Sequence, residues 1–389
     1  MKKRILIFSL AYYPHYVSGA EAAIKEITDR INEDEYEFHL ITHLFERNAQ
    51  RTEKIGNVTV YRVGFGGSRL SKILFVPLAA QKARELHKKF HLTGMWAMMT
   101  YMLMPVTLAR LIGVRIPYVL TLQDGDPYEK VFERTFINPF LPLIDKGFKD
   151  ATVIQVISEY LGTWPKKRGY QGEVVMVRNG ANPKNFEQLP IEQLEEVKQG
   201  LGKKEGEIYL FIAARLEYQK GIDVIVRALA LLPENIKFLI AGDGSEKEVL
   251  VGLAKELGVE DRVIFLGSLD RDDVPKYRNT VVSDIFVHPS RSEGLGNSVL
   301  SAMAGRLPVI ATQVGGLADF IFDEQSGRPP TAWAVEPDNP EQIAAAVRDI
   351  LANPQKVKER TENARTMVER EYRWEPIAID MQSVVFSKL

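Results

Sequence analysis

The sequence contains no cysteine among its 389 residues. It therefore has no disulfide, no thiolate metal site and no cysteine nucleophile, a composition compatible with the cytoplasm. Neither sign of charge is in excess, because 50 lysine and arginine residues face 51 aspartate and glutamate residues, for a formal net charge of −1. A chain this close to neutral lacks a global attraction to nucleic acid, so we expect no nucleic-acid partner.

Long apolar runs are also missing. Residues 95–114 are the strongest candidate for a membrane span, but Pro105 and Arg110 interrupt them, and a spanning helix needs about 20 predominantly apolar residues. Residues 1–10 superficially resemble a signal peptide, although polar and aromatic residues break the apolar run too early for one. We expect a buried first strand there and a cytoplasmic protein.

The sequence does contain short apolar runs, many rich in valine and isoleucine, that alternate with helical patterns. This alternation is typical of βαβ units around a parallel sheet and predicts an α/β fold. The candidate strands of the first half are 4–10, 37–42, 58–63, 118–122, 151–157 and 174–177. Those of the second half are 208–213, 237–241, 263–265, 284–288 and 309–312.

The chain is too long for one ordinary hydrophobic core, so we expect two domains. Turn-forming residues cluster at 179–183, and a polar stretch follows at 190–204. We therefore predict a first Rossmann-like domain over 1–180 and a second over 181–372, with a helical tail over 373–389.

Gly19 stands at the entrance to the helical run 22–31, after the first candidate strand. Ligands in open parallel sheets bind outside the carboxyl ends of the strands. A glycine there lets the backbone approach a ligand closely, and the free amides at a helix start favour an anion. Gly19 is thus a candidate phosphate contact, with an ordinary strand-to-helix loop as the alternative.

The segment 213–223 follows the strand that opens the second half, and it carries Arg215 and Lys220. Two cations that converge after a strand suit a leaving diphosphate, whose developing charge they would stabilise. Two solvated surface cations are the alternative.

The segment 288–312 is the most informative part of the chain. A strand ends near Pro289, Glu293 follows in a glycine-containing loop, and a helix is expected from Asn297 to a glycine cap at Gly305. The carboxylate suits a sugar hydroxyl, and the first helix amides suit phosphate or sugar oxygens.

In this order along the chain, the segments resemble the retaining glycosyltransferases of family 4, the glycosyl transferases of group 1. The resemblance runs nearly end to end through 19–21, 179–180, 214–215, 220–221, 241–244, 289–308 and 315–316. It implies the GT-B fold, in which two doubly wound Rossmann-like domains face each other across a cleft. It also implies that the tail returns to the first domain.

The implied activity is transfer of a hexosyl group from a nucleotide-diphosphate sugar to a glycan or lipid-linked acceptor, as in polysaccharide biosynthesis. The sugar nucleotide is a substrate, and no cofactor is implied. By resemblance, Gly19 lines the donor phosphate, Arg215 and Lys220 hold the diphosphate, and Glu293 meets the transferred sugar. The implied donor-binding residues also include Gly294, Leu295, Gly296, Asn297, Ser298 and Ser301.

Two residues depart from the family pattern. Ser301 replaces a glutamate that usually holds the nucleotide ribose, and Gln123 replaces a histidine that is frequent after this strand. An amide titrates no proton, so the chemistry cannot depend on a base at position 123. The departures leave open a non-catalytic nucleotide-sugar or glycan-binding relative, and an epimerase or phosphorylase of the same fold is a further alternative. Gln123, Asp124 and Asp126 are candidate contacts of the acceptor or of the transferred sugar.

The acidic triplets 124–126 and 270–272 match the two-carboxylate metal motif of the other major glycosyltransferase fold. That motif is short and common, and the surrounding architecture differs, so we predict no metal site and a metal-independent reaction. His87 and His91 lie one helical turn apart, and a solvated helix face explains this pair better than a metal.

The segment 68–91 mixes basic residues with apolar residues such as Leu70, Ile73, Leu74 and Phe75. Such a mixture predicts peripheral contact with anionic lipid at the inner face of the membrane. A helix packed by its apolar face, with a solvated basic face, is the alternative.

Overall fold

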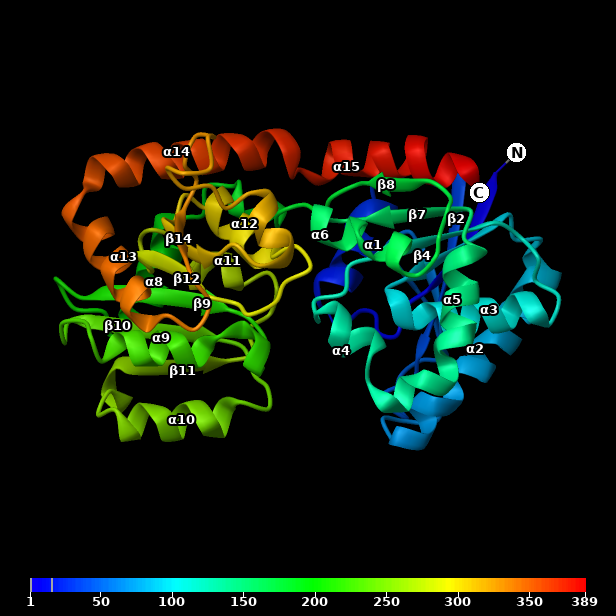
Figure 1. Ribbon diagram of the computed structural model, residues 1–389, viewed down its shortest axis with the longest axis horizontal. Helices are drawn as coiled ribbons and strands as arrows, with labels where there is room; N and C mark the ends of the chain where they lie inside the picture. Colours follow the sequence, from blue (N-terminus) through cyan, green and yellow to red (C-terminus); the bar gives the residue numbers. More distant parts are fainter. Residues whose placement is uncertain (1, 15–16) are drawn as a thin grey trace. The chain divides into compact units, whose positions relative to one another are not determined.

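The structure is a computed structural model that describes residues 2–14 and 17–389. Met1, His15 and Tyr16 lie outside the described residues. The chain divides into two compact units (Figure 1). The first unit comprises Met1–Asn179 together with Trp374–Leu389, and the second comprises Gly180–Arg373.

The first unit is built on an eight-stranded sheet in the order β3-β4-β2-β1-β5-β6-β7-β8. All neighbours are parallel except β3 and β4, which pair antiparallel. The strands are β1 (Lys3–Phe8), β2 (Tyr36–His43), β3 (Thr52–Ile55), β4 (Val58–Val63), β5 (Gly94–Met98), β6 (Tyr118–Leu122), β7 (Val153–Val156) and β8 (Val174–Met176).

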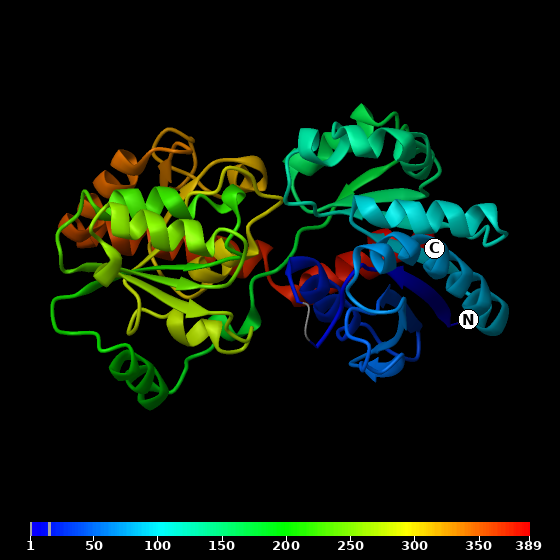
Figure 2. The same cartoon turned by 90° about the horizontal axis from the view of Figure 1, so that it is seen from below.

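Helices cover both faces of this sheet. On one face, α1 and the carboxyl-terminal helix α15 join the strands in a shared core, and Figure 2 shows this tail beside α1. Lys3 Nζ donates to Phe386 O at 2.9 Å, so the first strand and the tail are bonded directly. The helices of the unit are α1 (Gly19–Thr28), α2 (Arg69–Phe90), α3 (Leu103–Leu111), α4 (Tyr128–Phe132), α5 (Leu141–Lys149), α6 (Glu159–Gly162), α7 (Trp164–Lys167) and α15 (Trp374–Asp380).

The second unit contains a six-stranded, all-parallel sheet in the order β11-β10-β9-β12-β13-β14. Its strands are β9 (Ile208–Ala213), β10 (Ile236–Ala241), β11 (Val263–Gly267), β12 (Ile285–His288), β13 (Val309–Thr312) and β14 (Trp333–Val335). Its helices are α8 (Ile191–Gly200), α9 (Ile222–Leu229), α10 (Lys247–Glu256), α11 (Val274–Tyr277), α12 (Asn297–Ala304), α13 (Pro340–Ala352) and α14 (Pro354–Glu371).

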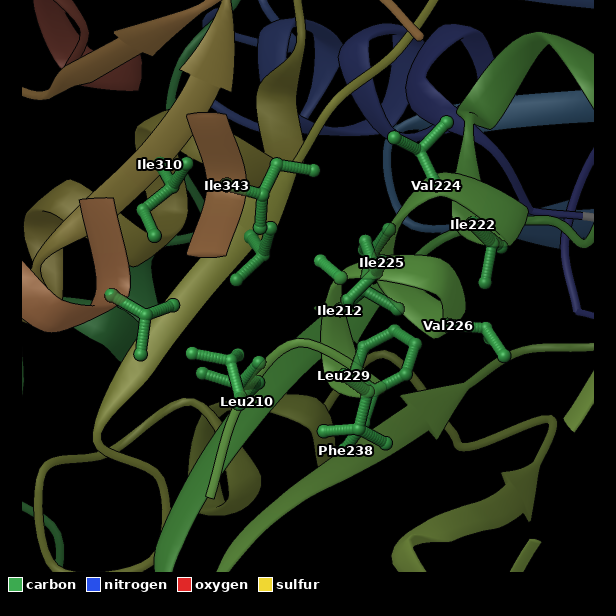
Figure 3. Close-up of a cluster of buried hydrophobic side chains, with 14 of the residues drawn as sticks. Leu210, Ile212, Ile222, Val224, Ile225, Val226, Leu229, Phe238, Ile310 and Ile343 are labelled. Atoms are coloured by element: carbon green, nitrogen blue, oxygen red, sulfur yellow. The ribbon is translucent and has the colours of Figure 1, made fainter. Parts of the chain in front are cut away.

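The core of the second unit forms where α9 and α13 pack on the sheet. Figure 3 shows Leu210 and Ile212 of β9 close to Ile225 and Leu229 of α9, with Phe238 of β10 beside them. All five side chains are fully buried. Each such side chain contributes roughly 1.5–3 kcal/mol relative to an exposed position. Replacing Phe238 by alanine would therefore cost about 3–5 kcal/mol, including the cavity left behind.

Both sheets reverse their strand order once. In the first unit the reversal lies between β1 and β5, and in the second it lies between β9 and β12. Open parallel sheets bind ligands outside the carboxyl ends of their strands at such switch points. The fold thus singles out the loops that follow these four strands.

All eleven strands predicted from the sequence are present, with ends shifted by at most a few residues. The sequence reading missed β3, β5 and β14. Strand β5 and helix α3 occupy the run 95–114, and none of the helices formed by the described residues is long and apolar enough to cross a membrane. The predicted cap at Gly305 has an ordinary φ of −79°, and Arg306 takes the left-handed position instead, with φ 60°.

Candidate active site

The loops after β9 and β12 meet at the switch point of the second unit. Lys220 ends a short 3₁₀ turn after β9, and Glu293 lies in the loop after β12. Gly221 has φ 63°, and a Cβ there would lie 2.2 Å from Pro289 O, so this close approach requires glycine. The contact places Lys220 Nζ 2.5 Å from Glu293 Oε1.

Glu293 is a buried carboxylate held by several donors. Its Oε1 accepts from Lys220, from His288 Nε2 at 2.8 Å and from Ser290 Oγ at 3.4 Å. Burial alone raises the pKa of Glu293, but the charge of Lys220 and the bond from His288 outweigh burial and hold that pKa far below its usual range. Burial lowers the pKa of His288, so its imidazole is neutral at pH 7 and donates Nε2–H to the carboxylate.

Arg291 ties the two loops together. Its guanidinium grips Asp223 in a bidentate pair at 2.9 and 2.8 Å and also donates to Tyr218 O at 2.5 Å. The Arg291 N–H donates to Gln219 O at 2.8 Å. Bidentate arginine–carboxylate pairs fix geometry as well as energy. Arg291 therefore positions the Lys220 segment against the Glu293 segment.

The predicted donor-binding loop runs from Glu293 into α12. Gly296 caps this helix with φ 96°, and the first amides of the helix, at Asn297 and Ser298, have no carbonyl of a preceding helical turn to donate to. Gly315 approaches so closely that a Cβ would lie 2.1 Å from Glu293 O. The backbone of this loop is thus packed directly against Gly315 at Glu293. Its buried members are Gly294, Leu295 and Gly296, whereas Asn297 and Ser298 are half-buried.

Ser301 is already engaged within the second unit. Its hydroxyl donates to Asn297 O at 2.8 Å and accepts from Asn182 N at 3.0 Å, and the residue is 4% exposed. Ser301 therefore links α12 to the turn that opens this unit.

Arg215 does not join the Lys220–Glu293 cluster. Its guanidinium pairs with Glu217 at 2.8 Å, and its side chain is 64% exposed. A pair this exposed contributes about 0–1 kcal/mol, so Arg215 can leave it at little cost.

In the first unit, Gly19 is exposed and begins α1. The Glu21 carboxylate accepts from Ser18 N at 2.7 Å and from Ser18 Oγ at 2.5 Å. The first turn of α1 therefore carries a carboxylate that offsets part of the positive helix dipole at Gly19.

Gln123 and Asp124 are buried at the end of β6. Gln123 Oε1 accepts from Asn179 Nδ2 at 2.8 Å, and its Nε2 contacts Met98 Sδ. Asp124 accepts from Thr100 N and Thr100 Oγ1 at 3.3 and 3.1 Å, yet burial raises its pKa to about 6. Two of the three candidate acceptor contacts are thus held inside the unit.

Asp126, the third candidate, is separate from that buried pair. It forms a partly exposed ion pair with Lys130 at 2.6 Å. Asp272 of the other acidic triplet pairs with Lys184 at 3.0 Å. Across residues 2–14 and 17–389, no group of three or more histidine, aspartate or glutamate side chains is placed to hold a metal ion.

His288 and Arg291 are functional candidates that the sequence reading missed. Both stand inside the segment 288–312, and the spacing of His288 from Glu293 was visible in the sequence. The interactions with Asp223 and Lys220 were not visible, because they join residues about seventy positions apart.

Comparison with known proteins places these observations in a protein class. Residues 193–367 match the family described as glycosyl transferases group 1. An uncharacterized glycosyltransferase of Methanocaldococcus jannaschii is 27% identical over 98% of this chain and 97% of its own length. Alpha-monoglucosyldiacylglycerol synthase of Streptococcus pneumoniae is 25% identical over 83% of this chain and 74% of its own length.

Solved structures agree on the fold. Sucrose-phosphate synthase from Thermosynechococcus elongatus matches with a TM-score of 0.85 at 19% identity, over 99% of both chains. HepE of Anabaena, in complex with UDP-glucose, matches with a TM-score of 0.79 at 20% identity, over 99% of both chains. The chain is therefore a glycosyltransferase with two Rossmann-like domains of the GT-B type. Its second unit carries the group 1 domain, so the resemblance seen in the sequence is confirmed at this level.

Proposed function

We propose that this glycosyltransferase moves a hexosyl group from a nucleotide-diphosphate sugar to a glycan or lipid-linked acceptor. We propose further that it retains the anomeric configuration and uses neither a metal nor a cofactor. The observation that carries the proposal is the buried Lys220–Glu293 pair beside the first amides of α12. The HepE complex with UDP-glucose and the name of the pneumococcal relative support a sugar nucleotide and a sugar-bearing product.

In this proposal Lys220 changes partner when the donor binds. Before binding, its ammonium neutralises Glu293. The donor diphosphate then takes the ammonium together with the amides at the start of α12, which favour an anion. Glu293 keeps its hydrogen bond from His288. Its carboxylate then accepts a hydrogen bond from a hydroxyl of the transferred sugar. Arg215 is free to add a second positive charge, because its present ion pair is exposed.

The reaction step balances without an enzymatic base. The bond between the anomeric carbon and the phosphate oxygen breaks, and the acceptor oxygen bonds that carbon on the same face. The acceptor proton passes to the released phosphate oxygen. Gln123 titrates no proton in this step, which is consistent with its fixed bonds to Asn179 and Met98.

A donor-panel screen tests the proposal. Purified protein is incubated with UDP-, GDP- and ADP-hexoses, and release of the nucleoside diphosphate is measured with and without EDTA. We expect turnover of one donor class and no loss on chelation, because Lys220, Arg215 and the α12 amides neutralise the diphosphate. Activity that disappears with EDTA and returns with Mg²⁺ or Mn²⁺ would contradict metal independence. NMR of the new anomeric centre tests retention.

A non-catalytic nucleotide-sugar or glycan-binding protein is the second candidate. The engagement of Ser301 by Asn182 favours it, because the hydroxyl at the ribose position is already bonded within the protein. Isothermal titration with the same donors separates the two candidates. Binding without turnover or donor hydrolysis favours the binding protein, and turnover excludes it.

We also propose that the start of α2 touches anionic lipid at the inner face of the membrane. Leu70 and Ile73 are 59% and 62% exposed and lie beside the exposed Arg69 and Lys72. Phe75, counted in this surface from the sequence, is fully buried and does not belong to it.

Sedimentation with vesicles tests the lipid contact. We expect binding to phosphatidylglycerol vesicles and little binding to phosphatidylcholine vesicles. Replacing both Leu70 and Ile73 by serine should abolish binding. Leu111→Ser, at another exposed leucine of the first unit (57%), is the matched control and should bind normally. Equal binding by all three proteins would contradict the proposal.

A further inference from the structure

The first unit contains a cavity of about 210 Å³ that the site described above does not use. It lies at the carboxyl ends of β1 and β2, with Tyr12, Tyr13, Phe45, Glu46, Gln50 and Arg62 among its lining residues. Pockets for drug-sized ligands begin at about 300 Å³. The cavity therefore fits one ring-sized group rather than an entire sugar nucleotide.

Aromatic side chains form much of the wall of this cavity. Tyr12 and Tyr13 meet edge to face at 5.4 Å, and Phe45 meets His43 in the same way at 4.6 Å. Rigid aromatic surfaces bind flat apolar faces and leave polar edges to form hydrogen bonds. A pyranose ring has this amphipathic character, because its C–H faces are apolar and its hydroxyls project at the rim.

The charge of the cavity disfavours an anionic ligand. Arg62 is the one lysine or arginine among the described lining residues, and its guanidinium is already bonded to Gln50 O and Tyr13 O, each at 2.8 Å. It also forms an ion pair with Glu53. Glu46 adds a second carboxylate to the lining. A phosphate would thus meet two carboxylates and a guanidinium that is already neutralised.

Two lysines approach the rings of the wall without lining the cavity. Lys25 lies over Tyr13 at 5.8 Å and is paired with Asp29, and Lys72 lies over Phe45 at 5.7 Å. Both ammonium groups contact ring faces, and neither lysine belongs to the lining of the cavity.

His43 also belongs to the lining, and its ring is held in place. Its Nε2 pairs with Ser71 Oγ at 2.9 Å, and Phe65 N already donates to the same hydroxyl. The serine proton is therefore directed to Nε2, which leaves the imidazole proton on Nδ1. In the described part of the chain this buried Nδ1 has no hydrogen-bond partner. Burial lowers the pKa of His43, so this ring adds no positive charge to the lining.

We propose that this cavity holds an unphosphorylated pyranose ring of the acceptor, with the ring face on Phe45 and the hydroxyls on Glu46 and Gln50. The assignment rests on the proposed transferase function. It moves the acceptor contact away from Gln123, because β6 is separated from β1 by β5 in the sheet order. It also predicts discrimination against sugar phosphates as acceptors.

Ligand-observed NMR on the full chain, without donor, tests the cavity. The probes are methyl α-D-glucopyranoside, methyl α-D-mannopyranoside, glucose 6-phosphate and inorganic phosphate. We expect at least one methyl glycoside to bind, and glucose 6-phosphate to bind at least tenfold more weakly. Tighter binding of glucose 6-phosphate, or binding of neither methyl glycoside, overturns the assignment.

Two variants localise that binding. Phe45→Ala removes a wall, and Gln50→Ala removes only an amide, since the bond to Arg62 uses the Gln50 backbone. Each should weaken methyl glycoside binding at least tenfold. Phe140→Ala, at a half-exposed phenylalanine of the same unit outside the lining, is the matched control and should bind as wild type. Wild-type affinity in the folded Gln50→Ala variant, or equal weakening in the control, overturns the assignment.

Donor hydrolysis without acceptor separates this inference from the proposed function. We expect Gln50→Ala to hydrolyse donor at the wild-type rate while its KM for the acceptor rises at least tenfold. Sugar binding that the variants abolish, in a protein that turns over no donor, would support the cavity and refute the transferase proposal. Donor turnover, together with sugar binding that the variants leave unchanged, would support the transferase proposal and refute the assignment of the cavity.

Discussion

Replacing Lys220 by methionine separates the two roles that the structure gives this lysine. It neutralises Glu293 now, and it is proposed to neutralise the donor diphosphate during transfer. The side chains of the pair are 12% and 10% exposed. Methionine preserves the apolar stem of the lysine and removes its charge, leaving the Glu293 carboxylate with His288 and Ser290 as its donors.

The expected loss of stability follows from this burial. Removing one partner of a buried ion pair costs about 3–5 kcal/mol, because the other charge stays uncompensated. For a unit of this size, that loss lowers the Tm by about 6–20 °C at roughly 2–4 °C per kcal/mol. Adding Glu293→Gln removes the stranded charge, so the double variant should recover about half of the lost stability. Turnover should not recover, since one electrostatic contact to the leaving group is worth on the order of 3 kcal/mol, or more than a hundredfold.

Urea unfolding and donor turnover are measured for both single variants and the double variant. Lys203→Met is the matched control, because Lys203 also forms a partly buried ion pair in this unit, with Asp284 at 2.6 Å. The control should lose stability and keep its turnover per folded molecule.

Two results would refute the reasoning. Stability changes that add within about 0.5 kcal/mol in the double variant would show that Lys220 and Glu293 are not coupled. Wild-type turnover in Lys220→Met would show that this lysine does not act on the leaving group.

Three further predictions concern single residues. Burial raises the pKa of Asp124 from 3.8 to about 6, so the native state binds the proton more tightly and loses stability as pH rises from about 4 to 6. Asp124→Asn should therefore gain about 3 kcal/mol at pH 7.5 and almost nothing near pH 3.5, as measured by urea titration, and an equal gain at both pH values would contradict this assignment. Ser301→Ala should cost about 1–2 kcal/mol by the same measurement, because Asn182 N loses its acceptor; unchanged stability would show that this bond contributes nothing. His288→Leu should lower kcat about tenfold at unchanged donor KM, because Glu293 loses the hydrogen bond from His288. His288→Gln, whose amide can donate to Glu293, should recover most of the rate. Equal rates in both variants would exclude this hydrogen bond as the cause.

Local sequence patterns were sufficient for most of the fold. Runs rich in valine and isoleucine marked strands such as 208–213 and 309–312 with both ends correct. Strand β5 was missed because its residues, Gly-Met-Trp-Ala-Met, include no β-branched side chain, and β14 is only three residues long. Short strands of this kind are specified by the neighbours they pair with more than by their own residues.

The site could be predicted from the sequence only in outline. The segments around Lys220 and Glu293 were recognisable, because glycines and helix starts mark them locally. Their pairing was not, since it depends on contacts such as Gly221 against Pro289 O, between loops far apart in the sequence. The bond from Ser301 to Asn182 was hidden for the same reason. Sequence patterns thus located the loops, and tertiary packing decided which side chains meet.

The chain passes between the units twice, and this connectivity has a practical consequence. The second unit is one uninterrupted stretch, whereas the first is assembled from both ends of the chain. Residues 180–373 could therefore be expressed by simple truncation, but the first unit could not, because 1–179 alone would lack Trp374, Met381 and Phe386 from its core. A short linker from 179 to 374 would restore them. In the order of the chain, the second unit is an insertion within the first, and the first unit completes its core only after the second has been synthesised.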